Sequence, residues 1–280
     1  MTPELSIVIP CFNGVEYTAA CLASIERHTP EGHEVILVDN GSTDGTAERF
    51  AATWEGEGAL IRNASNLGFG VACNQGIAAA EGRRVMVLNN DTIVTPGWFT
   101  AMETALSRDP GLGLVVPCSN HVGGPQMVDA IDYATAPSTE LDAYAARRAR
   151  ANAGVGRRVT RVSELCMAMT RELLDAIGGF DPVFGLGNFE DDDYSLRARI
   201  AGFGLWIADD SFIHHFGHRT FKILPDAYQR LLEENAVRFE MKWDMSLAED
   251  RELERTAERS FDPAVHRVDL ARWAPAGHPA

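Results

Sequence analysis

The apolar run Leu5-Ser6-Ile7-Val8-Ile9, closed by Pro10, opens the strand, helix and strand pattern that decides the fold. Residues 18–28 then carry apolar side chains at helical spacing, and a second β-rich run, residues 34–38, enters the turn Asp39-Asn40-Gly41-Ser42. Elements in this order form a right-handed βαβ unit, whose parallel strands end at one edge of the sheet. The sequence therefore predicts an α/β fold with a doubly wound, mostly parallel central sheet flanked by helices. Ligands bind such sheets at the edge where the strands end.

The same alternation continues along the chain, with one irregular interruption. Further strands are predicted over residues 59–62, 84–88, 113–117 and 164–169, and further helices over residues 43–54, 70–80, 96–108, 170–177 and 190–200. Residues 119–160 lose the apolar period, so we predict a loop-rich insertion with one exposed helix near residues 141–151. An amphipathic helix, residues 226–242, and a mixed-charge tail end the chain.

The composition limits the kinds of partner. The chain has 280 residues, with 25 Lys and Arg against 40 Asp and Glu, a net charge of -15. Nucleic acid is therefore excluded as a partner, because binding its phosphates requires a basic surface. No run approaches the roughly 18–20 apolar residues of a membrane span, and the N-terminus lacks the pattern of a signal peptide. We expect a cytoplasmic protein without a transmembrane segment, with peripheral contact to the inner membrane face left open. Its five cysteines lack metal-ligand spacing and are expected to be reduced and mostly buried.

Polar side chains follow the predicted strands where a ligand is expected. Asn13, Asp39 and Asp91 come just after three of these strands. Further along, Glu190-Asp191-Asp192-Asp193 places four consecutive carboxylates, which repel one another, inside an apolar-flanked segment. A cation, a positive substrate face or a catalytic base would account for such a cluster.

Five motifs in this order resemble the family 2 inverting glycosyltransferases, which have the GT-A fold. The motifs are Ser6-Ile7-Val8-Ile9-Pro10-Cys11-Phe12-Asn13-Gly14, Val38-Asp39-Asn40-Gly41-Ser42-Thr43-Asp44-Gly45-Thr46, residues 63–76, Leu88-Asn89-Asn90-Asp91, and Phe180-Asp181 with the acidic cluster. The match spans roughly residues 5–221. Gly185-Leu186-Gly187-Asn188 and the insertion further resemble the rhamnosyltransferase-like branch of the family.

The resemblance implies a domain organisation. Residues 1–243 would form the GT-A domain, with a nucleotide-sugar-binding half (1–117) and an acceptor and catalytic half (118–224). Residues 244–280 would form a C-terminal tail.

The resemblance also implies a nucleotide-sugar site on the first half. Its residues would be Pro10, Phe12, Asn13, Asp39, Asn66, Gly68, Asn74, Asn89 and Asn90. Asp39 would accept a hydrogen bond from the nucleotide base, and Gly68 would allow the backbone to approach the ligand closely. The simpler interpretations are an Asx turn at Asp39, a plain turn glycine at Gly68 and a helix-surface position at Asn74.

A divalent cation, Mn²⁺ or Mg²⁺, is the implied cofactor. Asn89-Asn90-Asp91 stands where many relatives carry Asp-x-Asp, and Mg²⁺ needs only one or two carboxylates besides substrate oxygens and water. A strand leading to a loop over residues 211–218 would supply His215 (or His214), and the spacing back from Thr220 favours His215. A strand-end turn acid and a structural histidine are the simpler interpretations.

The acidic cluster matches the family's catalytic pattern. Asp191 would be the general base that takes the proton of the attacking hydroxyl, and Glu190 would orient the acceptor or the sugar. Asp193 and Arg197 are expected to pair along a helix, and Asp192 is expected to be solvated. An acidic first turn that only complements the helix dipole is the alternative.

The predicted function is inverting transfer of a sugar from a UDP- or dTDP-sugar to a hydroxyl of a cell-surface glycan or lipid-linked acceptor. A sugar-1-phosphate nucleotidyltransferase would need a basic phosphate loop, and residues 10–15 contain no basic residue. A catalytically silent sugar- or nucleotide-binding scaffold of the same fold remains the second hypothesis.

Overall fold

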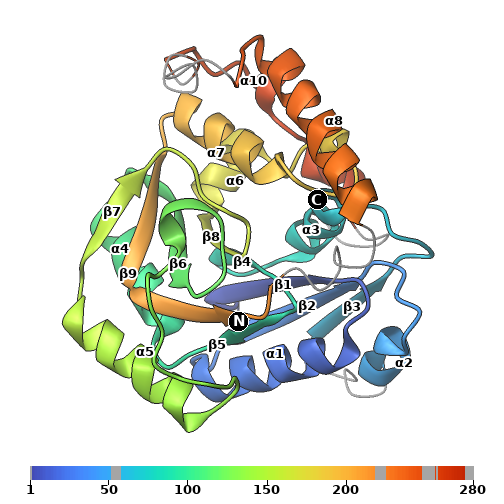
Figure 1. Ribbon diagram of the computed structural model, residues 1–280. Helices are drawn as coiled ribbons and strands as arrows, with labels where there is room; N and C mark the ends of the chain where they lie inside the picture. Colours follow the sequence, from blue (N-terminus) through green and yellow to red (C-terminus); the bar gives the residue numbers. More distant parts are fainter. Residues whose placement is uncertain (1, 52–57, 218–224, 248–255, 257, 275–280) are drawn as a thin grey trace.

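The computed structural model describes residues 2–51, 58–217, 225–247, 256 and 258–274 (Figure 1). The strands are β1 (Leu5–Cys11), β2 (His33–Asp39), β3 (Gly58–Arg62), β4 (Arg84–Leu88), β5 (Thr92–Val94), β6 (Leu112–Ser119), β7 (Gly156–Val159), β8 (Cys166–Thr170) and β9 (Gly204–His215). The α-helices are α1 (Val15–His28), α2 (Thr46–Ala51), α3 (Phe69–Ala79), α4 (Trp98–Arg108), α5 (Thr139–Ala151), α6 (Arg171–Ile177), α7 (Glu190–Ile200), α8 (Pro225–Trp243) and α10 (Pro263–His266). Short 3-10 helices are η1 (Gly124–Gln126), η2 (Pro182–Phe184) and η4 (Leu270–Trp273).

One mixed sheet forms the centre, with strand order β3-β2-β1-β4-β8-β6-β9-β5, and β7 also pairs with β9. The first four strands in this order are parallel, as predicted. In the other half, β8 is antiparallel to both β4 and β6, while β9 is parallel to β6. The carboxyl ends of β1, β2, β4, β6 and β9 therefore share one edge of the sheet. The amino ends of the antiparallel strands β8 and β5 lie at the same edge.

Alternating side chains of the strands form two apolar layers, one on each face of the sheet. In β1, Val8 packs on one face with residues of α3, α6 and α7, whereas Ile7 and Ile9 pack on the other with residues of α1 and α4. The two faces are therefore covered by different helices, and β1 is fully buried between them. All five cysteines are free and buried, as expected from their apolar contexts.

The insertion is more ordered than the sequence predicted. It contains η1, α5 and the strand β7, which pairs antiparallel with β9. The helix was predicted to be exposed, yet Leu141 and Ala145 of α5 are buried, because their face packs against the sheet. Two other strand segments were not predicted, namely β5 and the first half of β9. Residues 52–54 of the helix predicted over residues 43–54 lie outside the described part of the chain.

The C-terminal segment returns to the domain. Between α7 and α8 lies a third apolar cluster, with Phe239 and Trp243 from α8. Further along, Val268 donates its N–H to the carbonyl of Ile177 and accepts a hydrogen bond from Gly179, each at 3.0 Å. None of the helices in the described residues combines the length and the apolar character needed to cross a membrane.

Candidate active site

The sheet edge described above brings together groups from distant parts of the sequence. Leu88 at the end of β4 is opposite Cys166 at the start of β8, and Asn89 donates its N–H to the carbonyl of Leu165 at 3.1 Å. Thr92 at the start of β5 is opposite His215 at the end of β9. The segments before β5 and before β8 therefore lie side by side with the end of β4.

Asp91 and His215 form a close pair at this edge. The distance between Asp91 Oδ1 and His215 Nε2 is 3.0 Å, and both side chains are largely buried. His215 Nδ1 lies 2.6 Å from the carbonyl oxygen of His121, which can only accept, so Nδ1 carries a hydrogen. Burial would lower the pKa of His215, but the hydrogen bond with Asp91 and its negative charge outweigh burial, so the pKa is raised.

This pair suits a hard or borderline cation. When the His215 ring is neutral, its Nε2 lone pair lies 3.0 Å from Asp91 Oδ1, so the two atoms are close enough for one cation to contact both. Within the described residues no group of three or more His, Cys, Asp or Glu side chains is arranged to hold a metal. A cation here would therefore complete its coordination with substrate oxygens and water, as Mg²⁺ and Mn²⁺ do in phosphate-binding sites. His218 and Thr220 lie outside the described residues.

The loop after β6 fixes the orientation of His215, which the sequence did not reveal. The Asn120 side chain accepts a hydrogen bond from the His215 N–H at 2.8 Å and donates one to the His215 carbonyl at 3.1 Å. Asn120 therefore fixes the backbone of His215, and the His121 carbonyl fixes the tautomer of its ring. The only signal in the sequence is that Asn120 and His121 follow the end of a predicted strand.

His214 faces away from Asp91. Its Nδ1 lies 2.8 Å from the Tyr133 hydroxyl, in the insertion. Burial lowers the pKa of His214 to about 4, and the neighbouring His215 contributes in the same direction. Alternation along β9 thus places one histidine beside Asp91 and the other against the insertion.

The loops after β1 and β2 are tied to each other beside this pair. Asp39 is buried at the end of β2, and its Oδ1 accepts a hydrogen bond at 3.3 Å from the N–H of Ser42, three residues further along the turn. Asn13 donates its N–H to Ser42 Oγ at 2.8 Å, and its side-chain oxygen accepts from the Thr43 N–H at 2.8 Å. Pro10 lies within β1, and Phe12 follows its end.

Asn40, which the sequence marks only as a turn residue, organises the next loop. Its Nδ2 donates to Asn66 Oδ1 at 2.9 Å and to the Gly68 carbonyl at 3.1 Å. Its Oδ1 accepts from Asn63 Nδ2 at 3.0 Å and from the Leu67 N–H at 3.1 Å. The loop that carries Asn66 and Gly68 is thereby fixed to the end of β2.

Two of the predicted nucleotide-site asparagines make internal contacts instead of leaving their amides free. Asn74 is fully buried, and its Nδ2 and Oδ1 bond the carbonyl and the N–H of Phe180, each at 2.7 Å. Asn90 donates to the Asn13 carbonyl at 3.2 Å and to Thr18 Oγ1 at 2.9 Å. In contrast, Asn89 Oδ1 is buried and has no hydrogen-bond partner among the described residues.

The acidic cluster forms the first turn of α7 and contains a carboxyl pair with Glu164. The Asp191 and Glu164 side chains lie within reach of each other, so the ionisation of one carboxyl disfavours the ionisation of the other. Burial, and then the Glu164 carboxyl, raise the pKa of Asp191 well above its ordinary value. Burial likewise raises the pKa of Glu164. Glu164 was not among the predicted site residues, although it immediately precedes Leu165 at the sheet edge.

Glu190 is a further buried acid of this cluster. It is only 2% exposed, and its Oε2 has no hydrogen-bond partner among the described residues. Burial, and then the charge of Asp191, raise the pKa of Glu190 to about 8. Glu190, Asp191 and Glu164 thus form a group of carboxyls that retain protons more strongly than usual.

The other two acids of the cluster are paired with cations. Asp193 lies 2.8 Å from Arg197, one helical turn away, and both side chains are fully buried, which confirms the predicted pair. Lys242 of α8 also contacts Asp193, at 2.6 Å. Asp192 was expected to be solvated, but it is half-buried and lies 3.3 Å from Arg161.

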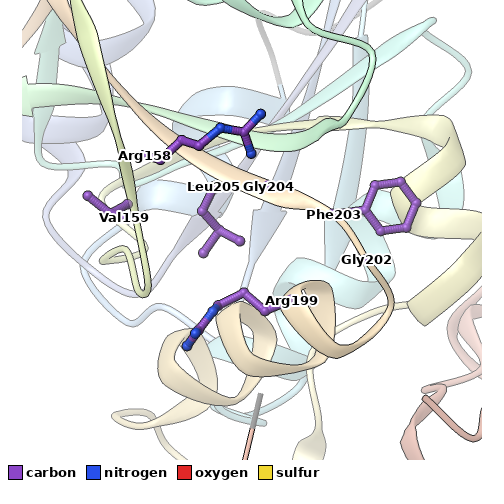
Figure 2. A pocket seen from close by; sticks show the side chains of 7 residues that line it. All are labelled: Arg158, Val159, Arg199, Gly202, Phe203, Gly204 and Leu205. Carbon is purple, nitrogen blue, oxygen red and sulfur yellow. The ribbon is translucent and has the colours of Figure 1, made fainter. Parts of the chain in front are cut away.

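A separate pocket lies far from these groups. It has a volume of about 320 Å³, and Figure 2 shows the residues that line it: Arg158, Val159, Arg199, Gly202, Phe203, Gly204 and Leu205. Gly204 begins β9, so it lies roughly 35 Å along the strand from His215 at about 3.3 Å per residue. The pocket is therefore at the opposite edge of the sheet and is not part of the candidate active site.

Comparisons with known proteins show the family and the fold of this chain. The model of the family "Glycosyl transferase family 2" matches residues 6–175. An uncharacterized protein of Mycobacterium tuberculosis, Rv1525, is 33% identical over 221 residues, which cover 78% of this chain and 76% of the relative. The N-acetylglucosaminyl-diphospho-decaprenol L-rhamnosyltransferase of the same species is 27% identical over 246 residues, covering 79% of this chain and 78% of that enzyme.

A solved structure shares the fold. The mannosyltransferase PcManGT from Pyrobaculum calidifontis, in complex with GDP-Man and Mn²⁺, superposes with a TM-score of 0.60 at 20% identity. The match covers 85% of this chain but only 64% of that enzyme. The mixed sheet with its flanking helices is thus the GT-A fold, and the chain belongs to glycosyl transferase family 2.

Proposed function

We propose that this glycosyltransferase moves a sugar from a UDP- or dTDP-sugar, with inversion, onto a hydroxyl of a cell-surface glycan or lipid-linked acceptor. The observation that carries the proposal is a continuous path of contacts along the sheet edge. Asp91 lies two residues after Asn89, whose N–H is hydrogen-bonded to the Leu165 carbonyl. The adjacent Glu164 carboxyl acts on Asp191 and raises its pKa. Asp91 with His215 and the carboxyl group of Asp191 therefore lie near one edge of the sheet, where the pair would bind the diphosphate and Asp191 would act as the base.

Asp191 would act as the general base. In a single in-line displacement, the acceptor oxygen forms a bond to the anomeric carbon while the bond from that carbon to the diphosphate oxygen breaks, which inverts the configuration. The acceptor proton passes to an Asp191 carboxylate oxygen, and the electron pair of the broken bond leaves with the diphosphate. Because its pKa is raised, Asp191 is a stronger base than an ordinary aspartate once it is ionised.

Asp91 and His215 would hold a divalent cation, Mn²⁺ or Mg²⁺. Such a cation, when bound, offsets the negative charge of the diphosphate and of the leaving group. Asn120 and the His121 carbonyl keep His215 Nε2 directed at Asp91. The mannosyltransferase PcManGT, whose fold this chain shares, forms its complex with GDP-Man and Mn²⁺, which supports this choice of cofactor.

The proposed donor follows from Asp39, the acid expected to bind the nucleotide base. The proposed acceptor follows from a relative. Asp39 would accept a hydrogen bond from the imide N–H that uracil and thymine share. Pro10, Phe12, Asn13, Asn66 and Gly68 would surround the nucleotide, and Asn74 would hold the Phe180 backbone in place. The relative N-acetylglucosaminyl-diphospho-decaprenol L-rhamnosyltransferase has a decaprenol-linked acceptor in its name. This similarity supports transfer to a lipid-linked glycan precursor.

The two halves of the domain would divide these tasks. Residues 1–117 would bind the nucleotide sugar, and residues 118–224 would bind the acceptor and supply the base. Residues 225–243 would complete the GT-A domain through α8, and residues 244–280 would be the tail. Within this tail, Val268 is hydrogen-bonded to Ile177 and Gly179.

The proposed base is tested by Asp191→Asn. We expect turnover of UDP- and dTDP-sugars in the presence of Mn²⁺ to fall by about 10²–10⁴-fold, the usual contribution of a general base. Binding of the nucleoside diphosphate should be unchanged. Asp175→Asn is the matched control, because Asp175 is exposed on α6 and should change turnover little. Equal turnover in wild type and Asp191→Asn contradicts the assignment, and nucleotide-sugar binding without turnover in wild type favours a silent scaffold.

A further inference from the structure

We infer that Asn188 and Glu190 form a subsite for a sugar hydroxyl, and that Tyr228 of α8 holds Asn188 in this site. The inference rests on the proposed function, because it gives that function a group that recognises the sugar itself. The residues involved are the loop before α7 and one face of α8.

The loop before α7 has an unusual backbone. Asn188 and Phe189 both have positive φ, 74° and 73°, although neither is glycine. Side chains rarely adopt this conformation, so it persists only where surrounding contacts impose it. The conformation turns the chain sharply into α7 immediately before Glu190.

Contacts from α8 impose this loop conformation. Asn235, which is fully buried, donates from Nδ2 to the carbonyls of Phe184 and Gly187, each at 2.7 Å, and to the carbonyl of Asn188 at 3.0 Å. Two helical turns earlier, the Tyr228 hydroxyl donates to Asn188 Oδ1 at 3.1 Å. Residues seven apart lie on the same face of a helix, so one face of α8 fixes both the backbone and the side chain of Asn188.

The loop leaves polar atoms buried without partners. Four buried side-chain polar atoms have no hydrogen-bond partner among the described residues, and they include Asn188 Nδ2 and Glu190 Oε2. A buried polar group without a partner costs free energy, so such atoms are rare unless a ligand satisfies them. The Tyr228 hydroxyl can donate a hydrogen bond to the amide oxygen of Asn188 or accept one from its amide nitrogen. In either orientation of the amide group, the other polar atom of Asn188 is left for a ligand.

The chemistry of these atoms selects a neutral hydroxyl. An amide N–H donates and a carboxyl oxygen accepts, and a hydroxyl can satisfy both at once. Anionic groups are disfavoured, because the charges of Glu164, Glu190 and Asp191 act on the same region and already raise the pKa of Tyr228, after burial. Pyranose rings carry several neutral hydroxyls, and both the donor sugar and a glycan acceptor could supply one.

Two variants test the subsite without large structural changes. Asn188→Gly removes the amide and suits the positive φ, whereas Tyr228→Phe removes only the hydroxyl that holds Asn188. Tyr144→Phe is the matched control, because the Tyr144 hydroxyl bonds the Ala130 carbonyl within the insertion. For each variant, thermal stabilisation by UDP or dTDP with Mn²⁺ is compared with stabilisation by the matching nucleotide sugar. The KM for n-octyl glycosides offered as acceptors is also measured.

We expect the variants to weaken binding of a sugar and to leave binding of the nucleoside diphosphate unchanged. Asn188→Gly should keep the stabilisation by the nucleoside diphosphate and lose the additional affinity for the nucleotide sugar, by about tenfold, if the hydroxyl belongs to the donor. If the hydroxyl belongs to the acceptor, the nucleotide-sugar affinity stays and the KM for the glycoside rises by about tenfold. Tyr228→Phe should act in the same direction to a smaller extent, and Tyr144→Phe should have no effect.

Any other pattern contradicts the inference, including unchanged nucleotide-sugar affinity together with an unchanged KM for the glycoside. Failure of the proposed function would look different, because wild type itself would then show neither stabilisation by nucleotide sugars nor turnover.

Discussion

Asp191 and Glu164 are the side chains on which the proposed chemistry depends most. Two carboxyls this close raise each other's affinity for protons, so the ionisation of Asp191 is coupled to that of Glu164. Glu190 and Asp192 add negative charge, and Arg161 is the nearby cation that opposes it. Such an arrangement sets the pH at which a base becomes available.

Replacing Glu164 by glutamine should move the acid limb of the pH profile. The substitution removes a negative charge and offers an N–H to the Asp191 carboxylate, so the pKa of Asp191 should fall. Because Asp191 works as a base only when ionised, the acid limb of kcat should shift to lower pH, and the rate on the plateau should decrease because a weaker base removes the proton less well. Turnover of the nucleotide sugar from pH 5 to pH 9 measures both effects. Glu172→Gln, at an exposed position of α6, is the control. An unchanged or upward-shifted limb would show that Glu164 does not influence the base.

The local pairs in this site were predictable, and the long-range ones were not. Asp193 and Arg197 are four residues apart on one helix, so their pairing follows from helical geometry. Glu164 acts on Asp191, which is 27 positions away in sequence. Asn40 is hydrogen-bonded to Asn66, 26 positions away. Asn120 is hydrogen-bonded to His215, 95 positions away. Their contacts exist only because parallel and antiparallel strands meet at one edge, and a single sequence does not give this arrangement directly.

The loop after β3 and the loop before α7 form the contact between the two halves of the site. Gly68 has φ 95°, and a Cβ at this position would lie 2.0 Å from the Gly185 carbonyl oxygen. The backbones of residues 68 and 185 therefore approach more closely than any side chain permits. This contact positions the acidic helix relative to the loop proposed to pass beneath the nucleotide.

Gly68→Ala should lower stability more than a matched glycine substitution. Gly45 also has a positive φ, 86°, but its added Cβ would meet no atom within 4 Å. We expect Gly45→Ala to cost about 1 kcal/mol from backbone strain alone, and Gly68→Ala to cost about 3 kcal/mol or more, because a backbone carbonyl must also move. Urea unfolding of both variants gives the difference. Equal losses in the free energy of unfolding would mean that the two loops can move apart without a loss of stability.

The order of the longer elements was predictable, and the short strands were not. Buried runs such as β1, β4 and β6 stand out because they are apolar and end in turn residues. β5 has three residues and β7 has four, two of them arginines, so neither has an apolar pattern long enough to be recognised. Both pair with β9, which extends the sheet beyond the parallel half.

The whole molecule is acidic, with a net charge of -15, yet it is proposed to bind a diphosphate. The overall field therefore repels the substrate, and positive charge must be supplied where the diphosphate binds. Asp91 and His215 are the described residues best placed to recruit a cation for this purpose. The cofactor would thus determine binding as well as catalysis.

The most direct test of the account is the stabilisation of Asp91→Ala by nucleoside diphosphates. Wild type, Asp91→Ala and Asp191→Asn are each melted with UDP, dTDP or GDP, in the presence and absence of Mn²⁺. We predict that wild type and Asp191→Asn show a rise in Tm that requires Mn²⁺, and that Asp91→Ala shows none, because the diphosphate then lacks its counter-ion. A full Mn²⁺-dependent rise in Asp91→Ala would contradict the central claim that this edge of the sheet binds the diphosphate through a cation on Asp91.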